Sequence, residues 1–189
     1  MSTLSDFNAS SLSFSLDGKI LSYCDGSAIR LLSVEAGQEI FNTETFKCGI
    51  LSPDGKTLVF DNDSLDISLW DVETGEEIRT LGKHSSDVGI VSFRPDGKLL
   101  ASGGNLDPVI KLWDMETGEE ILTLKTPIDL ASISFSPDGK LLASSSSSGI
   151  QLWNLDLDYL VERSCDRVRN YLKYNPKVTE EDRRLCDGI

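Results

Sequence analysis

Four copies of one tripeptide, Asp-Gly-Lys, divide most of this 189-residue chain into units of similar length. The steps between the copies are 37, 42 and 42 residues, counted between the glycines Gly18, Gly55, Gly97 and Gly139. The last three copies are each followed by a tryptophan, namely Trp70, Trp113 and Trp153. Self-similarity at a period of about 40 residues predicts a repeat architecture, in which each unit is one supersecondary structure that packs against its neighbours.

The third unit shows the shared pattern most clearly. An alternating stretch over 88–93 precedes a turn at 94–98, where proline fixes φ and Asp-Gly supplies the positive φ of a hairpin. Further strands are predicted over 99–102, 109–114 and 120–124, and the alternation places Ile110 and Leu112 on one strand face, opposite Lys111 and Trp113. Four short antiparallel strands with a Trp-Asp pair are typical of a β-propeller blade.

The region from about Leu4 to Leu155 resembles the WD-repeat β-propellers. The motifs that carry the resemblance are Ser-Pro-Asp-Gly-Lys, Leu-Leu-Ala-Ser, Ile-x-Leu-Trp-Asp and Thr-Gly-Glu-Glu. The resemblance implies four blades at approximately 4–43, 44–82, 83–124 and 125–155, followed by an extension at 156–189. It also implies a blade signature, which consists here of the four Asp-Gly glycines together with Trp70, Asp71, Trp113, Asp114 and Trp153.

The same resemblance implies a structural tetrad that locks a blade. Only the third unit supplies all of its members, which are His84, Ser102, Asp107 and Trp113. The second and fourth units keep the tryptophan but have no histidine, and the first has Leu32-Ser33 in place of Trp-Asp. Atypical units are common at the end of a repeat array.

The array lacks the blades that a closed ring needs. Met1–Leu4 aligns with the end of a fourth strand of a preceding blade, and the last unit has no fourth strand after Leu155. We therefore expect an all-β, incomplete propeller with an apolar face on its first blade and an incompletely paired edge on its last. The chain is accordingly interpreted as the C-terminal part of a larger propeller, or as an arc that closes an eight-bladed ring with a second copy.

The tail changes its period to that of a helix. Apolar residues recur every three or four positions over 157–172, and Asn175-Pro176 ends the pattern. The stretches 165–172 and 182–187 resemble the extension after the last blade of some bacterial WD-repeat proteins. The predicted role is an α-helical cap on the final blade, and the alternative is a docking helix for a partner.

The charge of the chain limits its partners and its location. The net charge is −13, and the tail with its eight acids and seven bases contributes little of it. Such a surface disfavours nucleic acid and anionic membrane; it serves solubility or, alternatively, attracts a basic partner. The stretch Met1–Ser10 lacks the features of a signal peptide, and no apolar run reaches the length of a membrane span. The predicted location is the cytoplasm.

The cysteines do not follow a metal-binding pattern, because no Cys-x-x-Cys occurs and the chain has one histidine. We expect Cys24 and Cys48 to behave as small hydrophobic residues. The tail cysteines Cys165 and Cys186 could meet, but a reducing compartment argues against a permanent bridge.

No combination of residues indicates an enzyme, a cofactor or a metal site. His84 is the sole histidine and falls at a structural position, while the acids of 61–66 suit a tight turn better than a calcium loop. The predicted function is a non-catalytic scaffold for protein–protein interaction, with a protein partner of unknown identity, the missing blades or a second copy. The alternatives are the sensor part of a larger signalling protein, with a kinase, NTPase or protease-like effector upstream, and a truncated gene product without independent function.

Overall fold

A computed structural model describes residues 10–24, 28–43, 49–62, 64–104 and 106–156, and in the tail 160, 165, 172–174, 177, 179–180 and 184–186. The first two sheets each contain four antiparallel strands in chain order. Their strands are β1 (Ser10–Phe14), β2 (Ile20–Cys24), β3 (Ile29–Ser33) and β4 (Gln38–Thr43), then β5 (Ile50–Leu51), β6 (Thr57–Asp61), β7 (Asp66–Asp71) and β8 (Glu77–Lys83).

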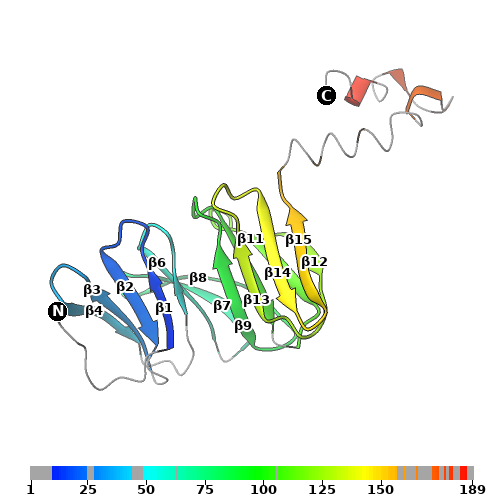
Figure 1. Cartoon of the computed structure of the whole chain (residues 1–189). Helices are drawn as coiled ribbons and strands as arrows, with labels where there is room; N and C mark the ends of the chain where they lie inside the picture. Colours follow the sequence, from blue (N-terminus) through cyan, green and yellow to red (C-terminus); the bar gives the residue numbers. More distant parts are fainter. Residues whose placement is uncertain are drawn as a thin grey trace.

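The third sheet repeats this order, and the fourth has three strands. Their strands are β9 (Val88–Phe93), β10 (Leu99–Gly104), β11 (Val109–Asp114) and β12 (Glu120–Lys125), then β13 (Ser132–Phe135), β14 (Leu141–Ser146) and β15 (Gly149–Asn154). Among the described residues the last unit has no fourth strand, in agreement with the expectation from the sequence. The sheets stand side by side without closing into a ring, which confirms an open propeller of four blades (Figure 1).

The Asp-Gly-Lys turns form because glycine supplies the backbone conformation that the hairpin needs. All four glycines have positive φ, between 70° and 76°. The preceding aspartate accepts a hydrogen bond from the backbone N–H of the following lysine, as Asp96 does from Lys98 at 3.0 Å. The four turns lie at the same end of the sheets, together with the β3–β4, β7–β8 and β11–β12 turns. We call this the Asp-Gly-Lys end.

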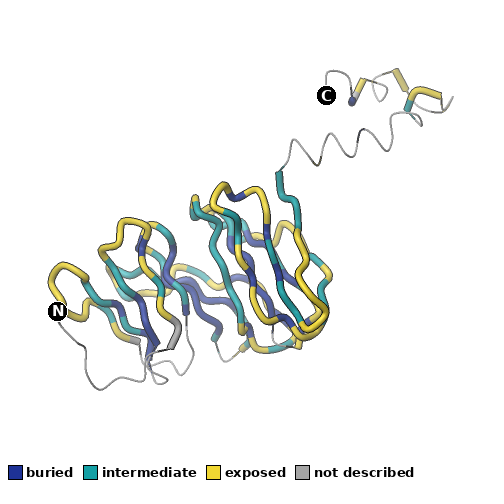
Figure 2. The backbone as a smooth tube through the Cα atoms, viewed as in Figure 1, coloured by how far each residue is buried: buried dark blue, intermediate teal, exposed yellow. Residues whose placement is uncertain are grey.

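The core lies between the sheets rather than within any one of them (Figure 2). Each of three hydrophobic clusters joins neighbouring blades. In the central cluster, Ile67 and Leu69 of the second blade pack with Leu100 and Trp113 of the third. Trp113 comes so close to Gly82 that an added Cβ there would lie 2.9 Å from the indole ring. This approach explains why a glycine stands within β8.

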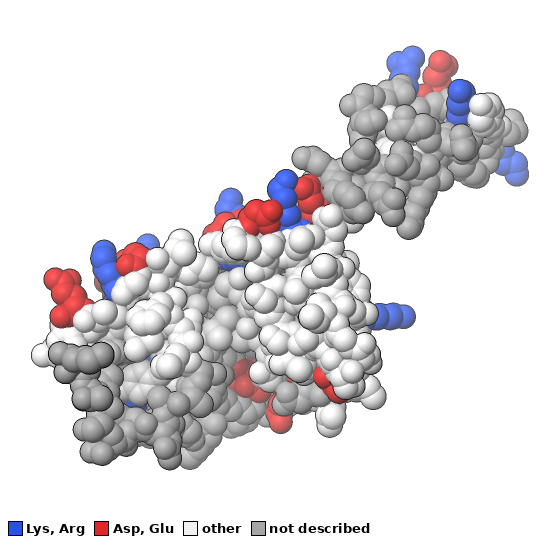
Figure 3. All heavy atoms as spheres, in the orientation of Figure 1, with Lys and Arg blue, Asp and Glu red and all other residues white. Residues whose placement is uncertain are grey.

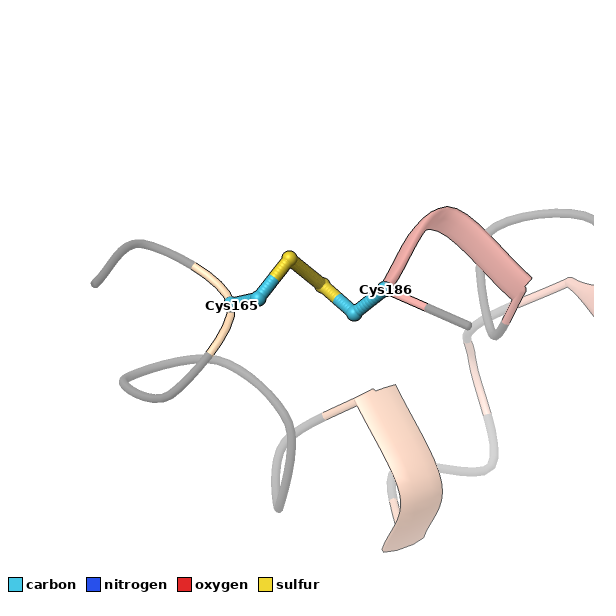
Figure 4. Close-up of a disulfide and its surroundings, with 2 residues drawn as sticks. All are labelled: Cys165 and Cys186. Carbon is cyan, nitrogen blue, oxygen red and sulfur yellow. A yellow bond between two sulfur atoms is a disulfide. The ribbon is translucent and has the colours of Figure 1, made fainter. Parts of the chain in front are cut away.

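The cysteines correct two sequence-based expectations. Cys165 and Cys186 form a disulfide with a Cα–Cα distance of 5.5 Å, so the argument against a bridge in the tail was wrong (Figure 4). Cys24 is also disulfide-bonded and is not the free hydrophobic residue that we expected. Cys48 lies outside the described residues. The tail disulfide contradicts the reasoning from a reducing compartment, which was an assumption about location.

The tail is only partly described. Its described residues include the 3₁₀ turn η1 (Arg184–Cys186) and the helical residues 172–174, while most of the predicted helix over 157–172 lies outside the described residues. Ile150 and Leu152 of β15 are 76% and 67% exposed, so no described residue covers this face of the last blade, and the α-helical cap stays a prediction. Within the described part of the chain, no helix is long and apolar enough to cross a membrane.

Candidate functional site

The structure brings His84, Ser102, Asp107 and Trp113 together in one buried network. His84 Nδ1 lies 2.9 Å from Asp107 Oδ2, and His84 Nε2 lies 2.7 Å from Ser102 Oγ. The indole N–H of Trp113 donates to Ser102 Oγ at 2.7 Å, and the backbone N–H of Ser85 donates to Asp107 Oδ2 at 2.9 Å. The network therefore connects the loop before β9 with β10, the β10–β11 turn and β11.

The hydrogen-bond partners determine the protonation of this network. Because Trp113 donates to Ser102 Oγ, the hydroxyl proton is free to point at His84 Nε2, which then accepts. His84 Nδ1–H is left to donate to the Asp107 carboxylate, so the partners assign a neutral imidazole beside an ionised acid. Burial lowers the pKa of His84, although Asp107 acts against this shift. Burial alone would raise the pKa of Asp107, but the Ser85 N–H and His84 lower it overall.

This chemistry is that of a structural lock rather than of a catalyst. His84 is 4% exposed, and its two ring nitrogens are both engaged within the protein. A catalytic base needs access to a substrate proton, which this geometry does not provide. Among the described residues, no group of three or more His, Cys, Asp or Glu side chains could hold a metal ion.

The fourth blade keeps half of the network. Trp153 Nε1–H donates to Ser144 Oγ at 3.3 Å, in the place of the Trp113–Ser102 bond. The hydrogen bond between the loop before the first strand and the turn between the second and third strands is reversed. The acceptor Asp129 lies in the loop before β13, and the backbone N–H of Ser147 in the β14–β15 turn donates to it at 2.9 Å. Sequence reasoning missed this reversed link, since it searched the turn for an aspartate and not the preceding loop.

The second blade replaces the network by aromatic packing. Phe60 stands where the third blade has Ser102, as their equal distances from Gly55 and Gly97 show. Its ring centroid lies 5.8 Å from that of Trp70, with the rings tilted by 36°. The Trp70 indole nitrogen is buried without a hydrogen-bond partner. The second blade thus has an aromatic contact in place of the hydrogen-bond network, and the indole N–H of Trp70 has no acceptor.

The other signature residues shape turns. Asp71 Oδ1 accepts from the backbone N–H groups of Glu73 and Thr74, at 2.9 and 2.8 Å. Asp114 makes the equivalent bonds to Glu116 and Thr117, at 2.9 and 2.8 Å. In the acidic stretch that sequence reasoning read as a turn, Asn62 Oδ1 accepts from the N–H groups of Ser64 and Asp66. These side chains therefore satisfy backbone donors of the turns, as expected for Asp and Asn at such positions.

The two ends of the arc carry a second candidate site. The Ile-x-Leu pair of each third strand is buried in the first three blades, at 2% exposure or less, because it packs on the next blade. The same pair in the last blade, Ile150 and Leu152, is 76% and 67% exposed, and no described residue covers it. At the other end, Leu12 and Phe14 of β1 are 67% and 60% exposed, whereas Ile133 at the position equivalent to Leu12 is buried against the third blade. Both halves of an inter-blade interface are thus exposed, one at each end.

Comparison with known proteins agrees with this architecture. Residues 75–114 and 118–154 match the family described as WD domain, G-beta repeat. The chain is 31% identical over 99 residues to a serine-threonine kinase receptor-associated protein of Gallus gallus, which covers 51% of this chain and 28% of that protein. It is 39% identical over 59 residues to a periodic tryptophan protein 2 homolog of Schizosaccharomyces pombe, which covers 31% of this chain and 7% of that protein.

A Neurospora crassa homolog of the same periodic tryptophan protein is 37% identical over 60 residues, again 7% of its length. The chain therefore spans less than a third of the length of each of these relatives. The repeats over residues 75–114 and 118–154 are therefore similar to WD repeats.

Proposed function

Since the chain is built of WD-type repeats, we propose that it is a non-catalytic scaffold for protein–protein interaction whose open ends accept further propeller blades. The observation that carries this proposal is the repeated Ile-x-Leu pair, buried against a following blade three times and exposed at Ile150 and Leu152. Leu12 and Phe14 supply the complementary face. The accepted blades belong either to further segments of a larger propeller or to a second copy of this chain.

The energy available at such an end is large. Covering about 500 Å² of apolar surface contributes about 12 kcal/mol at roughly 25 cal/mol per Å², before the cost of association is subtracted. That gross figure is of the order of the stability of a whole domain, about 5–15 kcal/mol. An uncovered end of this kind favours association, and the unpaired edge of β15 adds backbone donors and acceptors for a further strand.

The test is the solution mass of the purified chain, measured by light scattering over a range of concentrations. A discrete dimer supports closure by a second copy, and growth into larger species with rising concentration supports ends that await other blades. A matched pair of variants locates the effect: Ile150→Ser with Leu152→Ser should abolish association, whereas Ile121→Ser, on exposed β12, should not. A stable monomer with a cooperative melt and no binding of an apolar dye would overturn the proposal.

The finer alternatives stay predictions. A regulatory part of a larger signalling protein, a C-terminal position in that protein, a bacterial source and a cytoplasmic location each go beyond what the matches to WD-type repeats support. The tetrad residues His84, Ser102, Asp107 and Trp113 have a structural role in this proposal, which is to hold the third blade in the shape that its neighbours require.

A further inference from the structure

A groove of about 920 Å³ opens at the Asp-Gly-Lys end of the arc, over the first three blades. Its inner part is lined by the first turns of these blades, including Leu16, Pro53 and Pro95. Its outer part is lined by Ile78 on β8 and by Met115 in the β11–β12 turn. The size lies within the range of pockets that take small ligands or a few side chains of a peptide, about 300–1,000 Å³.

Contacts between blades hold the groove in shape. The backbone N–H of Leu16 donates to the carbonyl of Pro53 at 2.7 Å, which joins the first two turns. At the outer part, Arg79 Nη1 on β8 donates to the carbonyl of Glu116 at 3.2 Å, which joins the second blade to the third. Because both links come from the scaffold itself, the groove is formed before any ligand arrives.

The groove combines exposed apolar side chains with a negative rim. Ile78 is 49% exposed although it borders the groove, and Phe93 and Met115 are half-buried beside it. The charged residues of the lining are five acids and two bases, namely Asp17, Asp54, Asp96, Asp114 and Glu116 against Arg79 and Lys98. Arg79 donates to the backbone carbonyl of Glu116 and keeps its charge, while Asp17 and Asp96 are ion-paired with Lys19 and Arg94 at 3.4 and 2.8 Å. Asp54, Asp114 and Glu116 have no such ion pair among the described residues, so they supply the negative charge that is open to a ligand.

The rim acids are held ionised by their own turns. The backbone N–H of Lys19 lowers the pKa of Asp17, and that of Thr117 lowers the pKa of Asp114. Figure 3 shows that the charged side chains of the blades gather mainly along their upper edge, which is the Asp-Gly-Lys end, while the wall below is mostly uncharged. Acidic and basic side chains both lie along this edge, and acids outnumber bases among the residues that line the groove.

We propose that this groove binds a short segment of a partner protein in which a large apolar side chain is flanked by lysine or arginine. The apolar side chain covers Ile78 and Met115, and the basic side chains pair with Asp54, Asp114 and Glu116. This inference rests on the proposed function as an interaction scaffold and names one docking site and the chemistry of its partner. The site is separate from the blade-accepting pair Ile150 and Leu152, which lies on the fourth blade.

Charge complementarity selects this occupant over others. An acidic peptide or a nucleic acid would bring like charge to the rim, which disfavours binding. A purely apolar peptide would bring no counter-charge to Asp54, Asp114 and Glu116. The exposed Ile78 gives an anchor that the acids alone do not provide.

The experiment selects random heptapeptides displayed on phage against the immobilised full chain and against an Ile78→Ser, Glu116→Lys double variant. Both changes lie at exposed or half-exposed side chains, and circular dichroism and melting temperature verify the fold of the variant. We expect the wild-type chain to enrich peptides that combine Leu, Ile, Phe or Trp with Lys or Arg, and the variant to lose this enrichment. Ile121→Ser with Glu119→Lys, both outside the groove, is the matched control and should enrich the same peptides as wild type.

Fluorescence anisotropy of an enriched peptide then measures each contribution. Ile78→Ser and Glu116→Lys should each weaken binding about tenfold, while Lys98→Glu should strengthen it. Raising the salt from about 0.05 M to about 0.5 M should weaken binding through screening. Enrichment of acidic peptides, or of peptides that bind the double variant as well as wild type, would contradict the proposed docking site but not the scaffold function. A chain that enriches no peptide, yet associates through its ends, would also overturn the groove alone; failure of both tests would count against the scaffold as well.

Discussion

The indole N–H of Trp113 donates to Ser102 Oγ at 2.7 Å, and both side chains are buried, at 2% and 0% exposure. The same ring packs over Gly82 and takes part in the cluster that joins the second blade to the third. One side chain therefore serves the lock within a blade and the contact between blades.

Removal of the Trp113 ring should consequently be among the most damaging changes to this chain. Trp113→Ala should destabilise the fold by about 3–5 kcal/mol, because it deletes a buried aromatic side chain and leaves a cavity between two blades. Urea denaturation followed by circular dichroism measures the loss. A loss below about 1 kcal/mol would show that Trp113 does not serve as a lock.

A comparison of the two tryptophans isolates the hydrogen bond from the packing. Trp113→Phe removes a satisfied donor and leaves Ser102 with one partner fewer, whereas Trp70→Phe removes a donor that has no partner. We expect Trp113→Phe to cost about 1–2 kcal/mol more than Trp70→Phe in the free energy of unfolding. Equal costs would mean that the Trp113–Ser102 bond contributes little.

Ser102→Ala should leave two buried polar groups without hydrogen-bond partners. It leaves the Trp113 indole N–H without an acceptor and His84 Nε2 without a donor, in a site from which water is excluded. We expect a cost of about 1–3 kcal/mol from these unsatisfied groups. The control is Ser144→Ala in the fourth blade, where only the longer bond to Trp153 is lost and the cost should be smaller. Equilibrium urea titrations of both variants decide between these outcomes.

The free energy of unfolding should fall as the pH drops below about 6.5, where a free histidine side chain takes up a proton. Burial lowers the pKa of His84 in the folded state, so the unfolded chain binds a proton more readily than the folded chain does. The contribution of the neutral imidazole is therefore present above a pH of about 6.5 and is lost as the pH falls through the lowered pKa. His84 is the only histidine, so His84→Asn should flatten the change in urea midpoint between about pH 7.5 and about pH 5.5. A variant that keeps the full change would contradict this assignment.

The tail disulfide can be tested directly by mass spectrometry. Trypsin cleaves on both sides of Cys165, after Arg163 and Arg167, and after Arg184 before Cys186. Digestion without reductant should therefore yield the fragments 164–167 and 185–189 linked as one species, because Cys165 and Cys186 are bonded. Reduction should separate them. Two free fragments before reduction, from protein purified without reductant, would contradict the bridge.

Much of the fold could be predicted because the repeated turns leave few alternatives. Asp-Gly followed by lysine requires a hairpin with positive φ, and the alternation in β11 places Ile110 and Leu112 on the face that is in fact buried against the fourth blade. The missing fourth strand of the last unit followed from the helical period that begins after Leu155. These features depend on local backbone geometry and on spacing.

Other features depend on contacts between residues that are distant in the sequence, and the spacing of the repeat motifs does not predict these contacts. The packing of Phe60 on Trp70 replaces a hydrogen bond that the family pattern led us to seek, and the link from Asp129 to Ser147 joins a loop to a turn that the motif treats separately. The tail disulfide was missed because an assumed compartment was used to decide whether Cys165 and Cys186 pair. The groove was missed because it is assembled from turns of three blades.

The uneven distribution of the polar lock has a consequence for how the chain opens. Each blade touches only its sequence neighbours, so the stability of the array behaves as a sum of local terms and nearest-neighbour couplings. The third blade has the complete network and packs against a blade on either side. The first and last blades each have one face that no other described blade covers. Native-state hydrogen exchange should accordingly be slowest in β10 and β11 and fastest at the two ends, so the molecule frays inward from its termini. A scaffold that loosens in this order can exchange its terminal partners while its middle stays folded.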